Sequence, residues 1–357
     1  MDSLFDQLLS VRPYSVRTHS LEQLFLDELN ELSDHHYNNC REYRHIVDEV
    51  FEHRNTGNNL SELPYLPVGL FKRVSLVSSG DTASNMTLSS SGTTGTAKSQ
   101  VSVDADTSRR QQRAMAHCVG HVLGARRRSM LIIDTETVFS SGSTLSARGA
   151  GVLGMMRFGC NYCYALDEDL TLNLNRVKEF LNKVAGDDVF IFGFTYLVWQ
   201  SLGQLEDIDI DLSKAILIHS GGWKRMTDLA VDNSTFRSSL HKKYGLERIH
   251  NFYGMVEQLG TLHMEGSDYL LHVPTFSDVL IRDPKTFNVL PDGETGLIQV
   301  ISLVPRSYPG HSLLTEDLGF VIASNPASNW SSKALKVIGR VPRAEIRGCG
   351  DFGATLS

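Results

Sequence analysis

The sequence predicts an α/β fold in which mostly parallel sheets are flanked by helices, with a smaller β-rich part. Short apolar runs typical of buried strands occur at 130–134, 188–194 and 215–219. Segments with helical periodicity occur at 104–123, 171–184 and 225–243. Alternation of this kind is typical of a mainly parallel sheet. The C-terminal third, 270–340, differs, because an Asp292-Gly293 turn ahead of an alternating strand predicts a hairpin.

The first 60 residues are predicted to be helical, because leucine and phenylalanine recur there at helical spacing. Ser20, with Gln23 three residues later, resembles a capping box at the start of the second helix. A third, charged amphipathic helix is expected over 37–54, where an asparagine-rich turn ends it. We therefore expect residues 1–60 to form a helical segment packed on the main, catalytic domain, 61–357, which ends in a short C-terminal tail.

The composition excludes several classes of protein. The chain has 357 residues, 41% hydrophobic and 21% charged, which is an ordinary globular composition. Lys and Arg number 34 against 41 Asp and Glu, and a net charge of −7 argues against binding to nucleic acid. The longest apolar stretch, 189–199, is about half the ~20 residues of a spanning helix, so no membrane span is expected. An acidic N-terminus and five sparse cysteines favour the cytoplasm.

The strongest local signal is the segment 89–98, Ser-Ser-Ser-Gly-Thr-Thr-Gly-Thr-Ala-Lys. Glycines let backbone amides turn towards an anion, hydroxyls add donors and a lysine adds positive charge, so the segment predicts a phosphate-binding loop. It is not the P-loop of the NTPases, because Thr96 and Ala97 separate Gly95 from Lys98. The alternative is an ordinary surface loop. The candidate phosphate-binding residues are Ser91, Gly92, Thr93, Thr94, Gly95 and Lys98.

Together with three later blocks, this loop resembles the signature of the adenylate-forming enzymes, which include acyl-CoA synthetases, peptide-synthetase adenylation domains and firefly luciferase. The segment 253–257, Tyr-Gly-Met-Val-Glu, resembles the YGxTE block of that superfamily. The segment 315–319, Thr-Glu-Asp-Leu-Gly, resembles its TGDLG block, and 339–340 resembles its Gly-Arg pair. The blocks occur in the expected order over most of the chain. The resemblance implies the large N-terminal-type domain of these enzymes.

The resemblance also implies ATP and Mg²⁺ as cofactors and a role for each block. Tyr253 would lie against the adenine, Asp317 would bind the ribose hydroxyls, and Arg340 would reach the nucleotide. Lys98 and Glu257 would be catalytic, with Glu257 as the metal ligand. Joining a carboxylate to the α-phosphorus of ATP needs positioning, charge neutralisation and a metal that takes only one or two protein carboxylates. The nucleotide-binding candidates from these blocks are Tyr253, Gly254, Asp317 and Arg340.

Two substitutions and the length depart from the superfamily pattern. Val256 replaces the usual threonine, and Glu316 replaces the usual glycine. The sequence reaches residue 357 shortly after Arg340, where a typical member continues with a mobile C-terminal domain that carries a catalytic lysine. We expect that mobile domain to be lacking.

Within the superfamily the chain resembles one branch, the acyl-protein synthetases, which are the long-chain-fatty-acid–luciferin-component ligases of bacterial luminescence. The segments 219–224 and 253–258 resemble this branch's blocks, and Gly221 and Gly222 become nucleotide-binding candidates. In this branch the acyl group passes from the adenylate to a cysteine near the C-terminus and then to a partner reductase. The matching residue is Cys349, the third catalytic candidate. Two flanking glycines would allow mobility, and nearby arginines could lower its thiol pKa.

Two alternatives stay open at this point. The protein could be a compact acid–CoA ligase or a loader of acyl carrier protein, with Cys349 uninvolved. It could also be a nucleotide-binding subunit without catalysis, although the presence of Lys98, Glu257 and Asp317 argues against this. The resemblance to the long-chain-fatty-acid ligases implies that the carboxylic acid substrate is a fatty acid. Aromatic residues that could line its pocket, or equally belong to the core, are Phe139, Phe192, Phe194, Tyr196 and Trp199.

Weaker patterns are interpreted as structural. Cys160 and Cys163 have the spacing of a zinc or redox pair, but a structural zinc needs four ligands and no second close pair exists in the sequence. Packing is the expected role. His219 and His272 flank predicted strands, and we expect core positions for both, with the lining of an acid pocket as the alternative.

Overall fold

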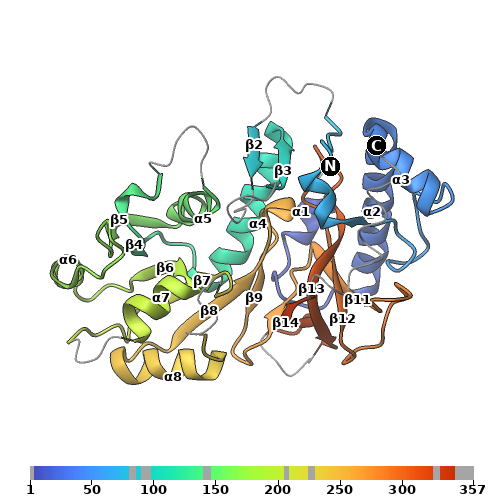
Figure 1. Ribbon diagram of the computed structural model, residues 1–357. Helices are drawn as coiled ribbons and strands as arrows, with labels where there is room; N and C mark the ends of the chain where they lie inside the picture. Colours follow the sequence, from blue (N-terminus) through green and yellow to red (C-terminus); the bar gives the residue numbers. More distant parts are fainter. Residues whose placement is uncertain are drawn as a thin grey trace. The chain divides into compact units, whose positions relative to one another are not determined.

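The computed structural model describes residues 4–79, 86–89, 98–139, 146–204, 209–223, 230–324 and 330–341. The chain forms two compact units (Figure 1). Unit 1 comprises residues 1–118, 254–263 and 270–357, and unit 2 comprises residues 119–253 and 264–269. The chain therefore passes from one unit to the other four times.

Unit 2 is built on a parallel sheet with the strand order β8-β7-β6-β4-β5. The strands are β4 Arg128–Ile133, β5 Gly159–Tyr164, β6 Phe190–Phe194, β7 Ile216–Ser220 and β8 Arg248–Tyr253. Each neighbouring pair is parallel. The three predicted buried strands correspond to β4, β6 and β7, so the α/β class with a mainly parallel sheet is confirmed.

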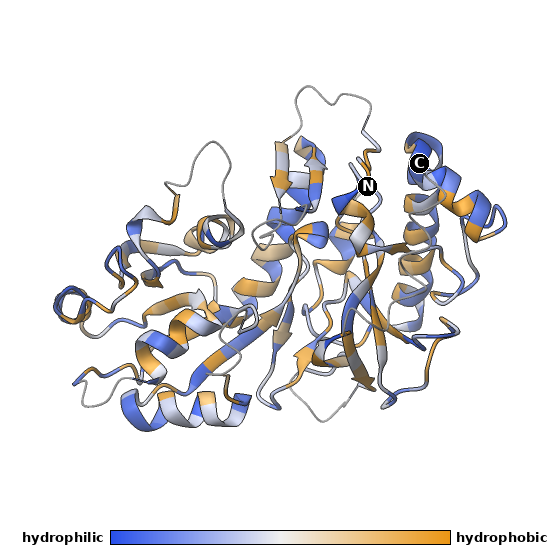
Figure 2. Ribbon diagram, in the orientation of Figure 1, coloured by the Kyte–Doolittle hydropathy of each residue, from blue (hydrophilic) through white to orange (hydrophobic). Residues whose placement is uncertain are grey.

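The helices of unit 2 cover this sheet with apolar side chains. They are α5 Ala147–Met156, α6 Leu174–Lys183, α7 Thr195–Val198, η3 Trp199–Gly203 and α8 Asn233–Tyr244. Figure 2 shows hydrophobic residues along β6, in the middle of this sheet. Phe236, Leu240 and Tyr244 of α8 belong to the same buried cluster as Leu217 of β7 and Ile249 of β8.

The helix predicted over 225–243 begins later than expected. Asp232 caps its N-terminus, because its side chain accepts a hydrogen bond from the amide of Thr235 at 2.7 Å. Its C-terminus ends at Gly245, whose left-handed backbone (φ +69°) suits glycine. Residues 224–229 lie outside the described part of the chain.

Unit 1 is built on a mainly antiparallel sheet, as the hairpin chemistry of the C-terminal third predicts. Its strand order is β11-β12-β13-β14-β10, and β1 pairs in parallel with β13. The strands are β1 Leu66–Pro67, β10 Leu271–His272, β11 Ser277–Arg282, β12 Gly296–Ser302, β13 Ser312–Ile322 and β14 Ala334–Arg340. Two further strands, β2 Met86–Ser89 and β3 Gln100–Val103, form a separate antiparallel pair. The short strand β9, His263–Glu265, spans the boundary at residues 263 and 264.

β12 is buried along its whole length, although its sequence alternates. Gln299 is the polar residue at its centre, and it is fully buried. Its carbonyl accepts a hydrogen bond from Arg282 Nε at 2.5 Å, and its amide donates to Ser312 Oγ at 3.0 Å. A buried amide with these partners is satisfied, so the alternation predicts a strand here without predicting an exposed face.

The N-terminal helices are α1 Leu4–Leu8, α2 His19–Asn39 and α3 Arg41–Val50, followed by a 3₁₀ turn, η1 Val68–Lys72. The prediction of Ser20 as the N-cap of α2 is wrong, since Thr18 accepts the hydrogen bond from the amide of Leu21. The extended backbone of Cys40 separates α2 from α3. A further helix, α4 Ala105–Leu123, crosses from unit 1 to unit 2. None of the helices in the described ranges has the length and apolar character that a membrane span requires.

A buried polar network joins α2 to the segment before β13. Ser33 Oγ lies 3.0 Å from His311 Nε2, and His36 Nδ1 lies 2.8 Å from Ser78 Oγ. The rings of His36 and His311 stack with centroids 4.8 Å apart. Burial, reinforced by the neighbouring histidines, lowers the pKa of His36, and burial lowers the pKa of His311 to about 3. Both rings are therefore neutral at physiological pH.

Candidate functional site

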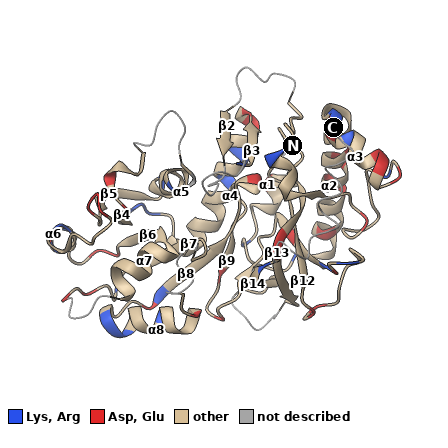
Figure 3. Cartoon of the chain, in the orientation of Figure 1, with Lys and Arg blue, Asp and Glu red and all other residues tan. Residues whose placement is uncertain are grey.

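Two predicted nucleotide-binding residues of unit 1 are brought together. Asp317 of β13 and Arg340 of β14 are register partners in an antiparallel pair, and Arg340 Nε donates to Asp317 Oδ1 at 3.1 Å. The Asp317 side chain is 14% exposed, whereas that of Arg340 is 76% exposed. Figure 3 shows the acidic residues on β13. The pair thus presents a sheltered carboxylate beside a guanidinium that can reach a ligand.

Glu257, the predicted metal ligand, lies in a 3₁₀ turn, η5 Val256–Gln258, and is only 5% exposed. Burial raises the pKa of its carboxyl group above the usual range. A hydrogen bond from the Ser99 side chain, together with the charges of Lys72 and Arg340, opposes this shift. Glu257 therefore stands in the electrostatic field of the same arginine that pairs with Asp317.

Lys98 is exposed and directly precedes Ser99, whose buried side chain contacts Glu257. The lysine end of the predicted phosphate-binding loop is therefore one residue from the Glu257 contact, where β3 begins. The other residues of that loop, Ser91, Gly92, Thr93, Thr94 and Gly95, lie outside the described residues, as does Cys349.

The predicted residues of unit 2 meet at the carboxyl edge of its parallel sheet. Ser220 and Phe252 are register partners on β7 and β8, and Ser220 Oγ donates to the Phe252 carbonyl at 2.8 Å. Gly221 and Tyr253 follow these partners directly. In open parallel sheets, ligands bind beyond this edge.

The two glycines after β7 differ in the space around them. Gly221 has a left-handed backbone (φ +85°), and an added Cβ would lie 3.2 Å from the Phe194 ring. A Cβ at Gly222 would meet no atom within 4 Å. Tyr253 is partly buried, and Gly254, the first residue of the following segment of unit 1, is exposed. Gly222 therefore leaves space at this edge, whereas Gly221 packs on Phe194.

Four residues around Glu257 and Asp317 were not predicted from the sequence. Ser99 contacts Glu257, and Gln258 follows it in η5 with a side chain only 2% exposed. Lys72 Nζ lies 4.0 Å from a carboxylate oxygen of Glu316. Ser99 and Gln258 adjoin predicted site residues, and Glu316 departs from the superfamily pattern; these are the signals that could have drawn attention to them. No sequence signal marks Lys72.

His219 and His272 are core residues, as expected from the sequence. His219 is 2% exposed, and its Nδ1 lies 2.9 Å from Thr195 Oγ1. Burial lowers its pKa to about 3. His272 is also 2% exposed, with its ring 5.5 Å from that of Trp330.

The aromatic residues suggested for an acid pocket divide into two groups. Phe192 and Trp199 are buried at 1% and 8% exposure, which identifies them as core residues. Phe139, Phe194 and Tyr196 are partly exposed.

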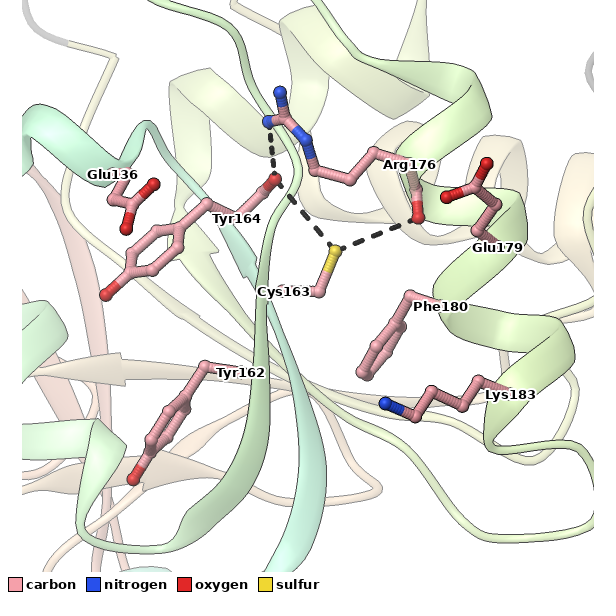
Figure 4. A pocket seen from close by; sticks show the side chains of 8 residues that line it. All are labelled: Glu136, Tyr162, Cys163, Tyr164, Arg176, Glu179, Phe180 and Lys183. Carbon is pink, nitrogen blue, oxygen red and sulfur yellow. Dashed lines mark hydrogen bonds between the residues drawn. The ribbon is translucent and has the colours of Figure 1, made fainter.

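Cys163 lines a cavity of about 620 Å³ beside β5 and α6 (Figure 4). Its sulfur lies 4.0 Å from the carbonyl oxygens of Tyr164 and Arg176, and it belongs to the buried cluster of unit 2. Burial raises the pKa of its thiol, opposed by Arg176. Cys160 and Cys163 are both free thiols, and the described residues contain no metal-binding group of three or more His, Cys, Asp or Glu. The predicted packing role fits Cys163.

Comparison with known proteins identifies the family of this chain. The profile of the acyl-protein synthetase family LuxE matches residues 2–355. The long-chain-fatty-acid–luciferin-component ligase of Vibrio harveyi is 25% identical over 333 residues, covering 88% of this chain and 83% of the relative. The Aliivibrio fischeri protein of the same name is 23% identical over 324 residues, with the same coverage.

Among solved structures, the chain resembles a 2-hydroxyisobutyryl-CoA ligase in an open conformation, in complex with 2-HIB-AMP and CoA. The TM-score is 0.65 at 15% identity, covering 92% of this chain and 71% of that one. This likeness confirms the predicted fold. The predicted branch is confirmed by the family match, and the prediction of an enzyme of the AMP-forming ligase type is confirmed with it. The chain belongs to the LuxE family of acyl-protein synthetases.

Proposed function

We propose that this protein activates a fatty acid with ATP and transfers the acyl group from the adenylate to the thiol of Cys349, for delivery to a partner acyl reductase. The main support for acid activation by ATP is the grouping of Asp317, Arg340 and Glu257 in unit 1. These three charged residues come from three separate sequence blocks, and the arginine interacts with both carboxylates. The names of the Vibrio and Aliivibrio relatives support a long-chain fatty acid as substrate.

In the first half-reaction, a carboxylate oxygen of the acid attacks the α-phosphorus of ATP. The bond from that phosphorus to the bridging oxygen breaks, and pyrophosphate leaves. Asp317 would accept hydrogen bonds from the ribose hydroxyls and hold the nucleotide in line for the attack. Lys98 and Arg340 would balance the charge that develops on the phosphate oxygens.

Mg²⁺ fits the residues around Glu257. Oxygen is the donor that Mg²⁺ prefers, and the ion commonly takes one protein carboxylate, with water and phosphate as its other ligands. Burial of Glu257 disfavours its charged form, so a bound cation would stabilise the carboxylate. When bound, the ion would neutralise phosphate charge, and Glu257 would hold it while Ser99 fixes the carboxylate.

In the second half-reaction, the Cys349 thiolate attacks the acyl carbon of the adenylate, a thioester forms and AMP leaves. The thiolate is the reactive form, and Arg343 and Arg347 would favour it. We propose a cytoplasmic setting for this chemistry, because both ATP and reduced thiols are available there.

Exchange of labelled pyrophosphate into ATP tests the first half-reaction. We expect exchange that depends on added fatty acid and on Mg²⁺, and large losses in Lys98→Ala and Glu257→Gln. Lys336→Ala is the matched control, since this exposed lysine of β14 is not among the charges that act on Glu257. Wild-type exchange in both site variants would refute the nucleotide site.

The acceptor is tested separately by adding coenzyme A, acyl carrier protein or neither. Acylation of the protein without either thiol supports Cys349 as acceptor. Acid activation that yields product only with coenzyme A or carrier protein would instead identify a compact ligase or a carrier-loading enzyme.

A further inference from the structure

Gln258, the residue after the proposed metal ligand Glu257, has a buried side chain that is held by two hydrogen bonds. It is 2% exposed, and its amide nitrogen donates two hydrogen bonds, to the carbonyl of Val300 at 3.1 Å and to that of Gly310 at 2.8 Å. Both acceptors lie far from Gln258 in sequence. Both amide protons are therefore used to attach η5 to β12 and to the segment before β13.

The backbone around Gln258 is fixed as well. Its amide donates to the Met255 carbonyl at 3.1 Å, and its own carbonyl accepts from Thr261 at 3.0 Å. Thr261 Oγ1 lies 2.7 Å from Ser302 Oγ, at the end of β12. Gly260, with φ +96°, packs so closely on α4 that an added Cβ would lie 2.8 Å from backbone atoms of Gln111.

The segment Tyr308–Gly310, which we name the strap, packs against the backbone of Glu257. A Cβ at Gly310 would lie 2.6 Å from the Glu257 backbone oxygen and 2.5 Å from the Tyr308 ring. Tyr308 is fully buried, and the charge of Glu257, after burial itself, raises the pKa of its hydroxyl. The strap is in turn fixed at its start, because the Ser307 amide donates to Thr107 Oγ1 at 3.0 Å and the Ser307 carbonyl accepts from the Ser78 amide at 2.7 Å.

We infer that Gln258 is a positioning residue: its two hydrogen bonds fix η5 against β12 and the strap, so that the Glu257 carboxylate is held where Mg²⁺ is to be bound. This inference rests on the proposed function of Glu257. Mg²⁺ requires near-ideal octahedral geometry with short bonds, so a small displacement of one carboxylate weakens its binding. Gln258 itself is neutral and enclosed, and it acts only through Glu257.

The test uses Gln258→Met, which keeps the length of the side chain and removes both donors. Gln299→Met is the matched control: Gln299 is an equally buried glutamine in the same unit, but its partners are Arg282 and Ser312 rather than the strap. We expect the Mg²⁺ concentration for half-maximal pyrophosphate exchange to rise at least tenfold in Gln258→Met, with the KM for the acid within twofold. Gln299→Met should lose thermal stability but keep the wild-type Mg²⁺ requirement.

A direct binding measurement separates this inference from the proposed reaction. Binding of Mn²⁺, followed by electron paramagnetic resonance with α,β-methylene-ATP present, should weaken at least tenfold in Gln258→Met and be unchanged in Gln299→Met. If the wild-type protein binds Mn²⁺ in this way but performs no exchange, the proposed reaction fails while the positioning role stands. A wild-type Mn²⁺ affinity in Gln258→Met, or an equal loss in both variants, overturns the inference.

If Gln258→Met does not fold, Gln258→Asn keeps the amide but shortens the side chain by one methylene, so its nitrogen cannot reach the Val300 and Gly310 carbonyls together. Its Mn²⁺ affinity should also fall, whereas Gln299→Asn should keep the wild-type affinity. Wild-type Mn²⁺ affinity in a folded Gln258→Asn would contradict the positioning role.

Discussion

The guanidinium of Arg340 donates a 3.1 Å hydrogen bond to the carboxylate of Asp317, its register partner across β13 and β14. Sequence blocks 23 positions apart thereby form one charged pair. With Arg340 76% exposed, this pair contributes little to folding stability. The role that we propose for the pair is accordingly nucleotide binding rather than stabilisation of the fold.

Substitution of Asp317 should weaken nucleotide binding without unfolding the protein. Asp317→Ala removes charge-assisted hydrogen bonds to the ribose, worth roughly 1.5–3 kcal/mol each, so the Kd for ATP should rise about 10- to 150-fold for each bond that is lost. Isothermal titration calorimetry measures the Kd, and the melting temperature reports folding. Asp292→Ala, at an exposed aspartate of the turn before β12, is the control. Wild-type ATP affinity in Asp317→Ala would show that Asp317 has only a structural role.

Ser99 should tune the ionisation of Glu257. The hydrogen bond from Ser99 favours the charged carboxylate, so Ser99→Ala should raise the pKa of Glu257 further. The acidic limb of the pH profile for Mg²⁺-dependent exchange should then move to higher pH. Ser102→Ala, a substitution three residues along on β3, provides the comparison. An unchanged acidic limb in Ser99→Ala would mean that Glu257 does not control this limb.

Cys349 should be required for acyl transfer but not for acid activation. Cys349→Ser should retain acid-dependent pyrophosphate exchange and lose the hydroxylamine-sensitive label that wild type acquires from radioactive fatty acid plus ATP. Cys160→Ser is the control, because Cys160 is a partly exposed free thiol of β5. Peptide mapping of the label checks the assignment. Full labelling of Cys349→Ser would transfer the role to another residue.

The buried histidines should make the fold sensitive to acid. Burial lowers the pKa of His219 and His311 to about 3 and that of His263 to about 4, against about 6.5 in the unfolded chain. The unfolded state therefore binds more protons below pH 6.5. Above about pH 6.5 the free energy of unfolding contains the full contribution of the neutral histidines. This contribution falls as the pH drops towards 3–4, by up to roughly 1.4 kcal/mol per pH unit for each histidine.

Urea unfolding at pH 7, 6 and 5 measures this dependence. His311→Gln should reduce the slope by about one proton, whereas His53→Gln, at an exposed histidine, should leave it unchanged. Equal slopes in wild type and His311→Gln would show that His311 is already protonated or titrates normally in the folded protein.

The features that could be predicted from the sequence are those that depend on a local pattern of residues. The buried strands β4, β6 and β7 were located because uninterrupted apolar runs are typical of parallel sheets. Asp317 and Arg340 were assigned to one site by resemblance, and their pairing fits that assignment. Thr18 rather than Ser20 caps α2, since either residue satisfies the same short-range rule and only the path of the chain decides between them. The contacts of Ser99 with Glu257 and of Gln258 with the strap join distant segments, and no local pattern predicts them.

Because the chain crosses between the two units four times, the two units become available for folding at different points of synthesis. Unit 2 needs nothing beyond residue 269, whereas unit 1 needs residues 270–357. Compact units tend to fold as they emerge during synthesis. The last two strands of the described residues, β13 and β14, carry Asp317 and Arg340. A nascent chain stalled before β13 therefore contains the whole parallel sheet but lacks the charged pair, so the proposed binding of nucleotide through that pair begins only after β14 has been translated.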